Sequence, residues 1–369
     1  MEKTHSPLYS IQALRGIAAL LVLFFHIFEL QSLTPGNPKD LIDGPWARGY
    51  AGVDLFFVIS GFIMVWITDA RSGGGATVGR FIYNRVTRIY PLWWLLSAVL
   101  VAYYLLTSGR AVSPDFAGQI DSDGLYLLRS FLLIPQDVPP INGLGWTLIH
   151  EMYFYIVFAA LLFLPARARY FGLWIWGALT VLLFGLGFAS YQAGSIIQLS
   201  ASLLTLEFLA GAAAAWLILR GYIFAPKLCL GLGIIGALCA LTFYTQRGTD
   251  LMLWGRVAVY ALPFTLVVYG AVALERSGKL SVPRPLSLLG DWSYSLYLSH
   301  LLILGVIIRL LPKFSEALVP THQGPLGNIV FIGLGLTVPI LVAAILYYGA
   351  ERPLLKLMRK RKQPEKAQR

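Results

Sequence analysis

Charged residues and cysteines are scarce in this sequence, and each shortage excludes a class of protein. Only 13% of the 369 residues are charged and 57% are hydrophobic, which excludes an ordinary soluble domain of this length. The two cysteines, Cys229 and Cys239, lie in one apolar run, where a helix would hold them about 15 Å apart, too far for a disulfide. The sequence therefore shows no disulfide framework and no CxxC metal motif, and we expect no bound metal.

Long apolar runs recur from one end of the sequence to the other. Each is about as long as the roughly 20 residues that a helix needs to cross a bilayer. We therefore predict an all-α, polytopic integral membrane protein with about ten transmembrane helices. The sequence divides into a transmembrane domain over 1–351 and a short basic cytoplasmic tail over 352–369. The predicted spans lie near 11–30, 49–69, 89–107, 145–165, 170–189, 199–219, 228–244, 257–274, 288–310 and 326–347.

Lysine and arginine gather on one set of alternate loops, which includes both ends of the chain. Because basic loops stay in the cytoplasm, we predict that the N- and C-termini are both cytoplasmic. The net charge of +11 then reflects topology and attraction to anionic membrane lipid, and no nucleic acid partner is expected. The first apolar run contains Arg15 and is followed by no small-residue cleavage site, so we interpret it as a retained span rather than a signal peptide.

The first span, which contains LRGIAALLVLFFH, carries Arg15 near its inner end and His26 in its outer half. A charged group in hydrocarbon costs from about 3 to above 10 kcal/mol, so a function usually compensates for it. On a helix the two side chains share one face, about 16 Å apart along the axis. The alternatives are that Arg15 reaches the cytoplasmic headgroups and that His26 makes a packing hydrogen bond.

Two acidic residues are expected at the depth of His26. Asp54 in GVDLFFVISGF and Glu151 in GWTLIHEMYFY begin the second and fourth spans, and both spans enter from outside. A histidine that transfers protons needs a partner that fixes its tautomer and stabilises its charged form. We therefore expect Glu151 or Asp54 to orient His26, although either acid has Arg48 of the outer loop as an alternative partner.

Three further segments carry polar or structural signals. In RFIYNRVTRIYPLWW, Arg85 and Arg88 share one helical face on the cytoplasmic side, which suits a phosphate, although plain membrane anchoring also explains them. The ninth span, GDWSYSLYLSHLLI, bears a polar stripe from Asp291 to His300 that is typical of a cavity wall. The apolar piece Leu125–Pro135 is too short to span and predicts a re-entrant or interfacial helix.

These segments resemble the successive motifs of acyltransferase family 3 from residue 11 to about 353. They occur in the family's order: LRGIAALLVLFFH, GVDLFFVISGFIM, RFIYNRVTRIYPLWW, GWTLIHEMYFY, LGDWSYSLYLSH and ERP. The resemblance implies a ten-span bacterial inner-membrane enzyme that moves an acyl group, usually acetyl, from cytoplasmic acyl-CoA to a sugar hydroxyl of a surface or secreted glycan. The chain ends after its tenth predicted span, so the stand-alone form without a fused hydrolase-like domain is expected.

The resemblance also implies roles for the polar residues. We expect His26 to act as general base, or alternatively as a covalent acyl carrier, with Glu151 or Asp54 beside it. Acetyl-CoA is the expected donor, and the partners expected are a glycan or lipid-linked oligosaccharide acceptor, membrane lipid and polysaccharide-biosynthesis proteins. The residues predicted to hold the CoA phosphates are Arg15, Arg85 and Arg88, and those predicted to line the sugar site are Trp146, Tyr153, Asp291, Tyr297 and His300.

Two other classes of protein remain open at this point. Buried charges across ten spans also suit a polytopic transporter or flippase for a glycan or related solute, although no pair of broken spans indicates inverted repeats. A transporter would move the acceptor without consuming acyl-CoA. A membrane scaffold would explain the basic loops but would leave the cost of His26, Asp54 and Glu151 unexplained.

Overall fold

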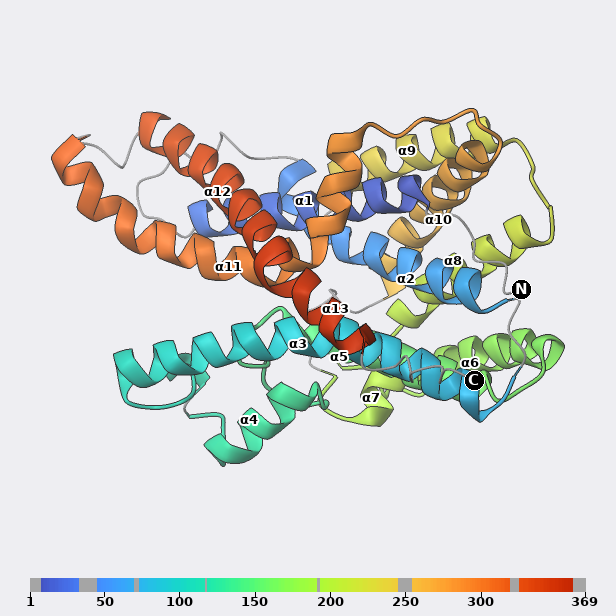
Figure 1. Ribbon diagram of the computed structural model, residues 1–369, viewed down its shortest axis with the longest axis horizontal. Coiled ribbons are helices and arrows are strands. Elements are labelled where there is room, and N and C mark those ends of the chain that lie inside the picture. The colour runs from blue at the N-terminus through green and yellow to red at the C-terminus, as the bar shows by residue number, and fades with distance from the viewer. Residues whose placement is uncertain are drawn as a thin grey trace, which may run out of the picture.

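The computed structural model consists of helices joined by loops and contains no strand among the residues that it describes (Figure 1). It describes residues 8–32, 45–69, 73–116, 118–190, 193–244, 254–318 and 325–360. The elements are α1 (Tyr9–Ser32), the 3-10 helix η1 (Pro45–Ala51), α2 (Gly52–Thr68), α3 (Gly75–Ser108), η2 (Pro114–Phe116), α4 (Asp123–Leu132), α5 (Gly145–Leu161), α6 (Ala166–Gly185), α7 (Ile196–Ser200), α8 (Leu204–Leu219), α9 (Pro226–Phe243), α10 (Trp254–Arg276), α11 (Arg284–Leu318), α12 (Pro325–Leu346), the π-helix η4 (Tyr347–Glu351) and α13 (Arg352–Lys360).

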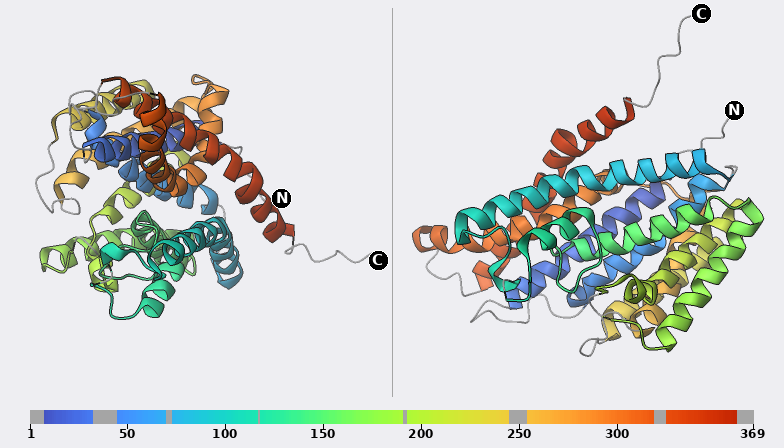
Figure 2. Two further views of the ribbon diagram at one scale, coloured as in Figure 1. Left: turned by 90° about the vertical axis from the view of Figure 1, so that its left-hand side faces the viewer. Right: turned by 90° about the horizontal axis from the view of Figure 1, so that it is seen from below.

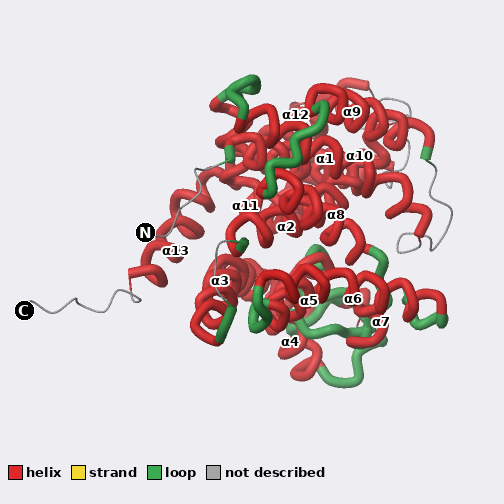
Figure 3. Tube along the Cα trace, turned by 90° about the vertical axis from the view of Figure 1, so that its right-hand side faces the viewer, coloured by secondary structure: helices red, strands yellow, loops and turns green. Residues whose placement is uncertain are grey.

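The helices form two groups, which Figures 1 and 3 show one above the other. One group contains α3 to α7, and the other contains α1, α2 and α8 to α12. Figure 2 shows the same division end-on and shows that the long helices run in a common general direction. Helix α2 contacts α5, and α11 contacts α3, so these pairs join the groups.

The helices confirm the predicted class, an all-α polytopic membrane protein. Within the described residues, 8 helices are long and apolar enough to cross a membrane, and two shorter apolar helices, α5 and α8, occupy the fourth and sixth predicted spans. Large apolar side chains such as Leu106, Trp174 and Phe224 are exposed on the helices or at their ends, as expected for surfaces that face lipid. The exact number of spans and the side on which the termini lie stay predictions.

Helices α1 and α11 pack side by side in the same direction. A Cβ added to Gly290 would lie 1.9 Å from the carbonyl oxygen of Gln12, so the two backbones almost touch there. Further along both helices, the rings of His26 and His300 lie 4.9 Å apart between centroids. Residue numbers rise on both helices from the first contact to the second. The two helices are therefore parallel, as a first and a ninth span must be.

Helices α2 and α8 also approach each other through glycines. A Cβ at Gly61 would lie 1.7 Å from the carbonyl oxygen of Phe208, and a Cβ at Gly211 would lie 1.8 Å from that of Val58. Small residues permit such close backbone contact between membrane helices, where van der Waals packing supplies much of the association. This contact fixes α2, which carries Asp54 and other polar residues of the site.

Replacing Gly61 by alanine should lower the thermal unfolding temperature of the detergent-solubilised protein. The added methyl group forces α2 and α8 apart, and overpacking of this kind costs about 1–3 kcal/mol or more. Gly231→Ala is the matched control, because Gly231 is also helical and its Cβ would meet nothing within 4 Å. Equal unfolding temperatures for the two variants would contradict the tight contact.

The apolar piece Leu125–Pro135, predicted as a short helix, falls largely within α4. Its last turn ends in main-chain carbonyl groups that need donors. Three aromatic side chains of α3 donate hydrogen bonds to these carbonyls: Tyr90, Trp93 and Trp94. Helix α4 is therefore fixed to α3, while its depth in the membrane stays a prediction.

The predicted boundary between the transmembrane domain and the basic tail lies inside continuous helix. Helix α12 passes through η4 into α13 without a break. The Tyr83 hydroxyl donates to the carbonyl of Met358 at 2.7 Å, which holds α13 against α3. The first nine residues of the predicted tail are thus helical, and residues 361–369 lie outside the described part.

Candidate active site

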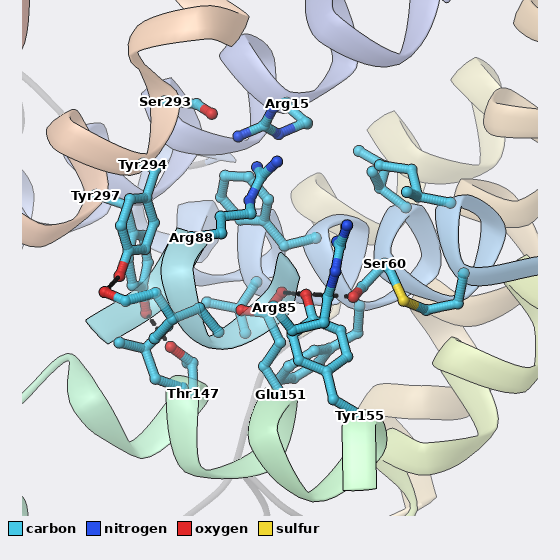
Figure 4. Close-up of a pocket in the computed structure, with 18 residues that line it drawn as sticks. Arg15, Ser60, Arg85, Arg88, Thr147, Glu151, Tyr155, Ser293, Tyr294 and Tyr297 are labelled. Atoms are coloured by element: carbon cyan, nitrogen blue, oxygen red, sulfur yellow. Dashed lines mark hydrogen bonds between the residues drawn. The ribbon is translucent and has the colours of Figure 1, made fainter. Parts of the chain in front are cut away.

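Two pockets lie between the two groups of helices. The first, here called the basic pocket, is lined by Arg15, Arg85, Arg88 and Glu151 and contains about 750 Å³ of empty space, partly open to solvent (Figure 4). The second, here called the histidine pocket, contains about 980 Å³, also partly open. Its polar wall consists of His26, Glu29, Tyr50, His150, Arg256 and Tyr297. Val53 and Tyr297 line both pockets, so the pockets are adjacent there.

Arg15 is held at the basic pocket by its neighbours on α1 and α11. Its guanidinium donates to Oε1 of Gln12 at 2.8 Å, and Nε2 of Gln12 donates to Asp291 at 3.1 Å. Gln12 lies at the close contact between α1 and α11, so the packing of these helices sets the position of Arg15. Asp291 itself lines neither pocket, and its predicted contact with a sugar has no support in this geometry.

Arg85 and Arg88 extend from α3 into the same pocket. The Arg85 guanidinium lies over the rings of Phe81 and Tyr155, at 5.8 and 5.6 Å from their centroids, and its buried Nε makes no hydrogen bond with the described residues. Figure 4 shows the guanidinium group of Arg88 beside that of Arg15. Like charges this close repel strongly in a low-dielectric site, and a bound anion would relieve the repulsion. The pocket is therefore suited to phosphate groups.

Glu151 faces the basic pocket and not His26. It accepts hydrogen bonds from the hydroxyl of Tyr155 and, at 3.5 Å, from that of Ser60. It is the one acidic residue in a wall that contains three arginines. The expected contact between Glu151 and His26 does not form, because Glu151 lines the basic pocket and His26 lines the histidine pocket.

Hydroxyl groups occupy the junction of the two pockets. The hydroxyl of Tyr297 lies 2.8 Å from Oγ1 of Thr147, which in turn donates to the carbonyl of Leu144 at 2.9 Å. Thr147 lines the basic pocket, and Tyr297 lines both. The predicted polar stripe of the ninth span thus reaches a cavity wall at Tyr297.

A second histidine orients His26. Nδ1 of His26 lies 2.9 Å from the carbonyl oxygen of Val22 and 3.1 Å from Nε2 of His300, while Nδ1 of His300 lies 3.0 Å from the carbonyl oxygen of Leu296. A carbonyl oxygen only accepts hydrogen bonds, so each neutral ring carries its proton on Nδ1. His300 then accepts from His26, and Nε2 of His26 is the basic nitrogen left available at the pocket.

Asp54 is bound to an arginine that sequence reasoning did not select. Nε of Arg256 donates to Oδ1 of Asp54 and its terminal nitrogen donates to Oδ2, each at 2.7 Å. Both side chains are almost fully buried, at 0% and 1% exposure. Asp54 therefore does not orient His26, and the alternative partner, Arg48, donates instead to the carbonyl of Leu241 at 3.2 Å. Similar depth in the membrane led us to expect that Asp54 or Glu151 contacts His26, and neither contact forms. Depth does not specify how each helix is rotated about its axis, and this rotation decides which side chains meet.

The aromatic residues predicted for the sugar site divide between two locations. Trp146 lines the histidine pocket. The hydroxyl of Tyr153 accepts a hydrogen bond from Nε1 of Trp176 at 3.1 Å, and Tyr153 lines neither pocket. Tyr153 thus packs on α6, away from the cavities.

His150 is a pocket residue that sequence reasoning did not single out. It directly precedes Glu151, and one step along a helix turns the side chain by about 100°. Glu151 therefore faces the basic pocket while His150 faces the histidine pocket. This rotation is a signal that the motif GWTLIHEMYFY already contains.

A metal centre is not evident in the described part of the chain, where no group of three or more histidine, cysteine or acidic side chains is placed to hold an ion. The groups available for chemistry at the pockets are imidazole, guanidinium, carboxylate and hydroxyl. Such a set can bind an anion, accept a proton and hold a polar acceptor.

Known proteins resemble the chain over most of its length. The model of acyltransferase family 3, described as an acyltransferase domain, matches residues 8–348. The exopolysaccharide production protein ExoZ of Rhizobium meliloti (strain 1021) is 34% identical over 282 residues, which cover 71% of this chain and 78% of that protein. Acyltransferase MdmB of Streptomyces mycarofaciens is 25% identical over 375 residues, which cover 96% and 93%.

A further relative is longer than this chain. The O-acetyltransferase OatA of Staphylococcus aureus (strain NCTC 8325 / PS 47) is 24% identical over 388 aligned residues, which cover 96% of this chain and 59% of that protein. No solved structure gives a significant match.

Proposed function

The chain belongs to acyltransferase family 3, and from this we propose that it transfers an acetyl group from acetyl-CoA to a hydroxyl of an exopolysaccharide, another cell-surface glycan or a lipid-linked precursor. The observation that carries the proposal is the contact between an arginine-lined pocket and a pocket with a basic histidine nitrogen, at Val53 and Tyr297. An acyl group delivered through the first pocket would meet an acceptor in the second.

The basic pocket is proposed to hold the CoA part of the donor. The phosphates of CoA are polyanionic, and guanidinium groups offer them paired donors of fixed geometry. Arg15, Arg85 and Arg88 supply these donors from two helices, and Glu151 limits the positive charge of the wall. The positive-inside prediction puts this pocket toward the cytoplasm, where acyl-CoA is made, and places the enzyme in the inner membrane.

His26 is proposed as the general base. Its Nε2 takes the proton of the acceptor hydroxyl as the hydroxyl oxygen attacks the thioester carbonyl. The bond between carbon and sulfur then breaks, and the leaving sulfur takes that proton from the imidazolium. His300 keeps Nδ1–H of His26 in place through the 3.1 Å contact and thereby holds Nε2 toward the acceptor.

The glycan acceptor is proposed from the relatives and from the histidine pocket. One relative is named for exopolysaccharide production and another as an O-acetyltransferase. The pocket wall combines the aromatic side chains of Trp146 and Tyr50 with the polar groups of Glu29 and Arg256, a mixture that suits a sugar ring. Proteins of polysaccharide biosynthesis are then the expected partners.

Label transfer from acetyl-CoA tests the function. Membranes that contain the chain are incubated with a crude glycan and acetyl-labelled acetyl-CoA, and label in the isolated glycan is measured against membranes without the chain. Chain-dependent label in the glycan is expected. Movement of glycan across the membrane with no consumption of acetyl-, propionyl- or succinyl-CoA would overturn the proposal in favour of a transporter.

Replacing Arg88 by alanine should raise the KM for acetyl-CoA by about 10- to 100-fold, since a charge-assisted hydrogen bond contributes about 1.5–3 kcal/mol. Lysine at the same position should recover part of the loss, because it keeps the charge without the planar fork. Arg80→Ala is the control, because Arg80 is an exposed arginine of the same helix that lines neither pocket. An unchanged KM for acetyl-CoA in Arg88→Ala would contradict the donor site.

A further inference from the structure

We propose that His150 selects the acceptor by accepting a hydrogen bond from a second hydroxyl of the sugar, beside the hydroxyl that His26 activates. The inference rests on the proposed function and extends it to the recognition of the acceptor. The ligand class is a sugar unit with at least two free hydroxyl groups. His150 is thus a specificity-determining residue, and the histidine pocket is the acceptor subsite.

The hydrogen bonds of His150 leave one nitrogen without a partner. Its Nδ1 lies 2.9 Å from the carbonyl oxygen of Trp146, so the ring proton is on Nδ1 and Nε2 is an acceptor. The side chain is 1% exposed, and Nε2 makes no hydrogen bond within the described residues. A buried acceptor without a donor is unfavourable. A donor that enters the histidine pocket would remove this cost.

His150 and His26 are built alike but have different surroundings. Each ring directs Nδ1 to the carbonyl four residues earlier on its own helix, and both rings line the histidine pocket. His26 contacts His300, whereas the rings of Trp146, Phe57 and Phe154 surround His150, at 5.6, 6.1 and 6.4 Å between centroids. Repulsion from Arg256 acts on His150, where a second positive charge would be unfavourable, and does not act appreciably on His26. His150 is therefore suited to accept a hydrogen bond and His26 to accept a proton.

A hydroxyl group is the donor that this geometry favours. The pocket opens partly to solvent and has room for a sugar unit. The rings of Trp146 and His150 are nearly perpendicular, at 88°, with centroids 5.6 Å apart, so an aromatic side chain lies beside the unpaired acceptor. Apolar ring faces with peripheral hydroxyl donors match such a wall. An anion would face the lone pair of Nε2 and is therefore not favoured at this position.

The test compares His150→Phe and His150→Gln in the full-length chain in membranes. The probe is the crude glycan that receives label from acetyl-CoA in the wild-type protein. His150→Phe keeps a ring but removes the acceptor, and the KM for glycan should rise by about 5- to 100-fold, with kcat and the KM for acetyl-CoA little changed. His150→Gln retains an acceptor oxygen and should recover part of that rise. NMR of the product should show acetyl groups on additional hydroxyls with His150→Phe.

Three results would overturn the inference. The first is an unchanged KM for glycan in His150→Phe, which is expected if Nε2 binds only a water molecule. The second is a lower kcat in both variants without a change in the KM for glycan, which would indicate a role of His150 in the chemical step. The third is an equal KM for glycan in His150→Phe and His150→Gln although both proteins accumulate to the wild-type level, which would indicate that His150 contributes only to packing. Absence of transfer by the wild-type chain is a separate outcome, because it overturns the proposed function itself.

Discussion

Replacing His26 by alanine should lower the rate of acetyl transfer to glycan by about 10²- to 10⁴-fold, the contribution usual for a general base. The loss should appear in kcat, while the KM for acetyl-CoA stays close to wild type, because the arginines proposed to hold the donor lie in the other pocket. Steady-state label transfer in membranes with equal amounts of each protein provides the measurement. A variant that transfers label at the wild-type rate would remove His26 from the mechanism.

Variants of His300 separate the positioning of His26 from its chemistry. His300→Leu removes one of the two acceptors for Nδ1–H of His26 and leaves the carbonyl of Val22, so it should lower kcat by a smaller factor than His26→Ala does. His300→Gln keeps an oxygen near the position of Nε2 and should recover part of the rate. A covalent acyl-histidine would instead give labelled protein when acetyl-CoA is supplied without glycan. Label on the wild-type chain but not on His26→Ala would replace general base catalysis by that route.

The parts of the site that could be predicted from the sequence lie on single helices. The spacing of Arg15 and His26 puts both on one face of α1, and the structure places each of them at a pocket wall. The spacing of Arg85 and Arg88 likewise puts both on the face of α3 that lines the basic pocket. A helix has fixed geometry, so residues within it keep their relative positions whatever the rest of the fold does.

The parts that could not be predicted are contacts between helices. Asp54 and Arg256 are 202 positions apart, and the sequence holds no signal for that pairing. His26 and His300 are 274 positions apart, and their contact depends on the close approach of α1 and α11 at Gly290. Depth in the membrane limits the possible partners of a residue, but the rotation of each helix about its axis chooses among them. That rotation is set by packing over the whole interface.

Removing one partner of the buried pair of Asp54 and Arg256 should destabilise the protein more than removing both. Asp54→Ala or Arg256→Ala leaves one charge buried without its partner, which typically costs about 3–5 kcal/mol. The double variant Asp54→Leu with Arg256→Met removes both charges and should recover much of that loss, because apolar residues of similar size often replace a buried pair at little cost. Thermal unfolding of the detergent-solubilised variants measures the effect.

The exposed ion pair of Arg220 and Asp69 supplies the control for the thermal unfolding measurement. Arg220 and Asp69 form an ion pair with side-chain exposures of 44% and 18%, so Arg220→Ala should cost no more than about 1 kcal/mol. Single variants at Asp54 as stable as Arg220→Ala would contradict the role of the buried pair.

If the double variant regains stability and transfers label, Asp54 acts through the fold, since it contacts Arg256 rather than His26. If it regains stability but stays inactive, the positive charge of Arg256 at the histidine pocket is needed by the reaction itself.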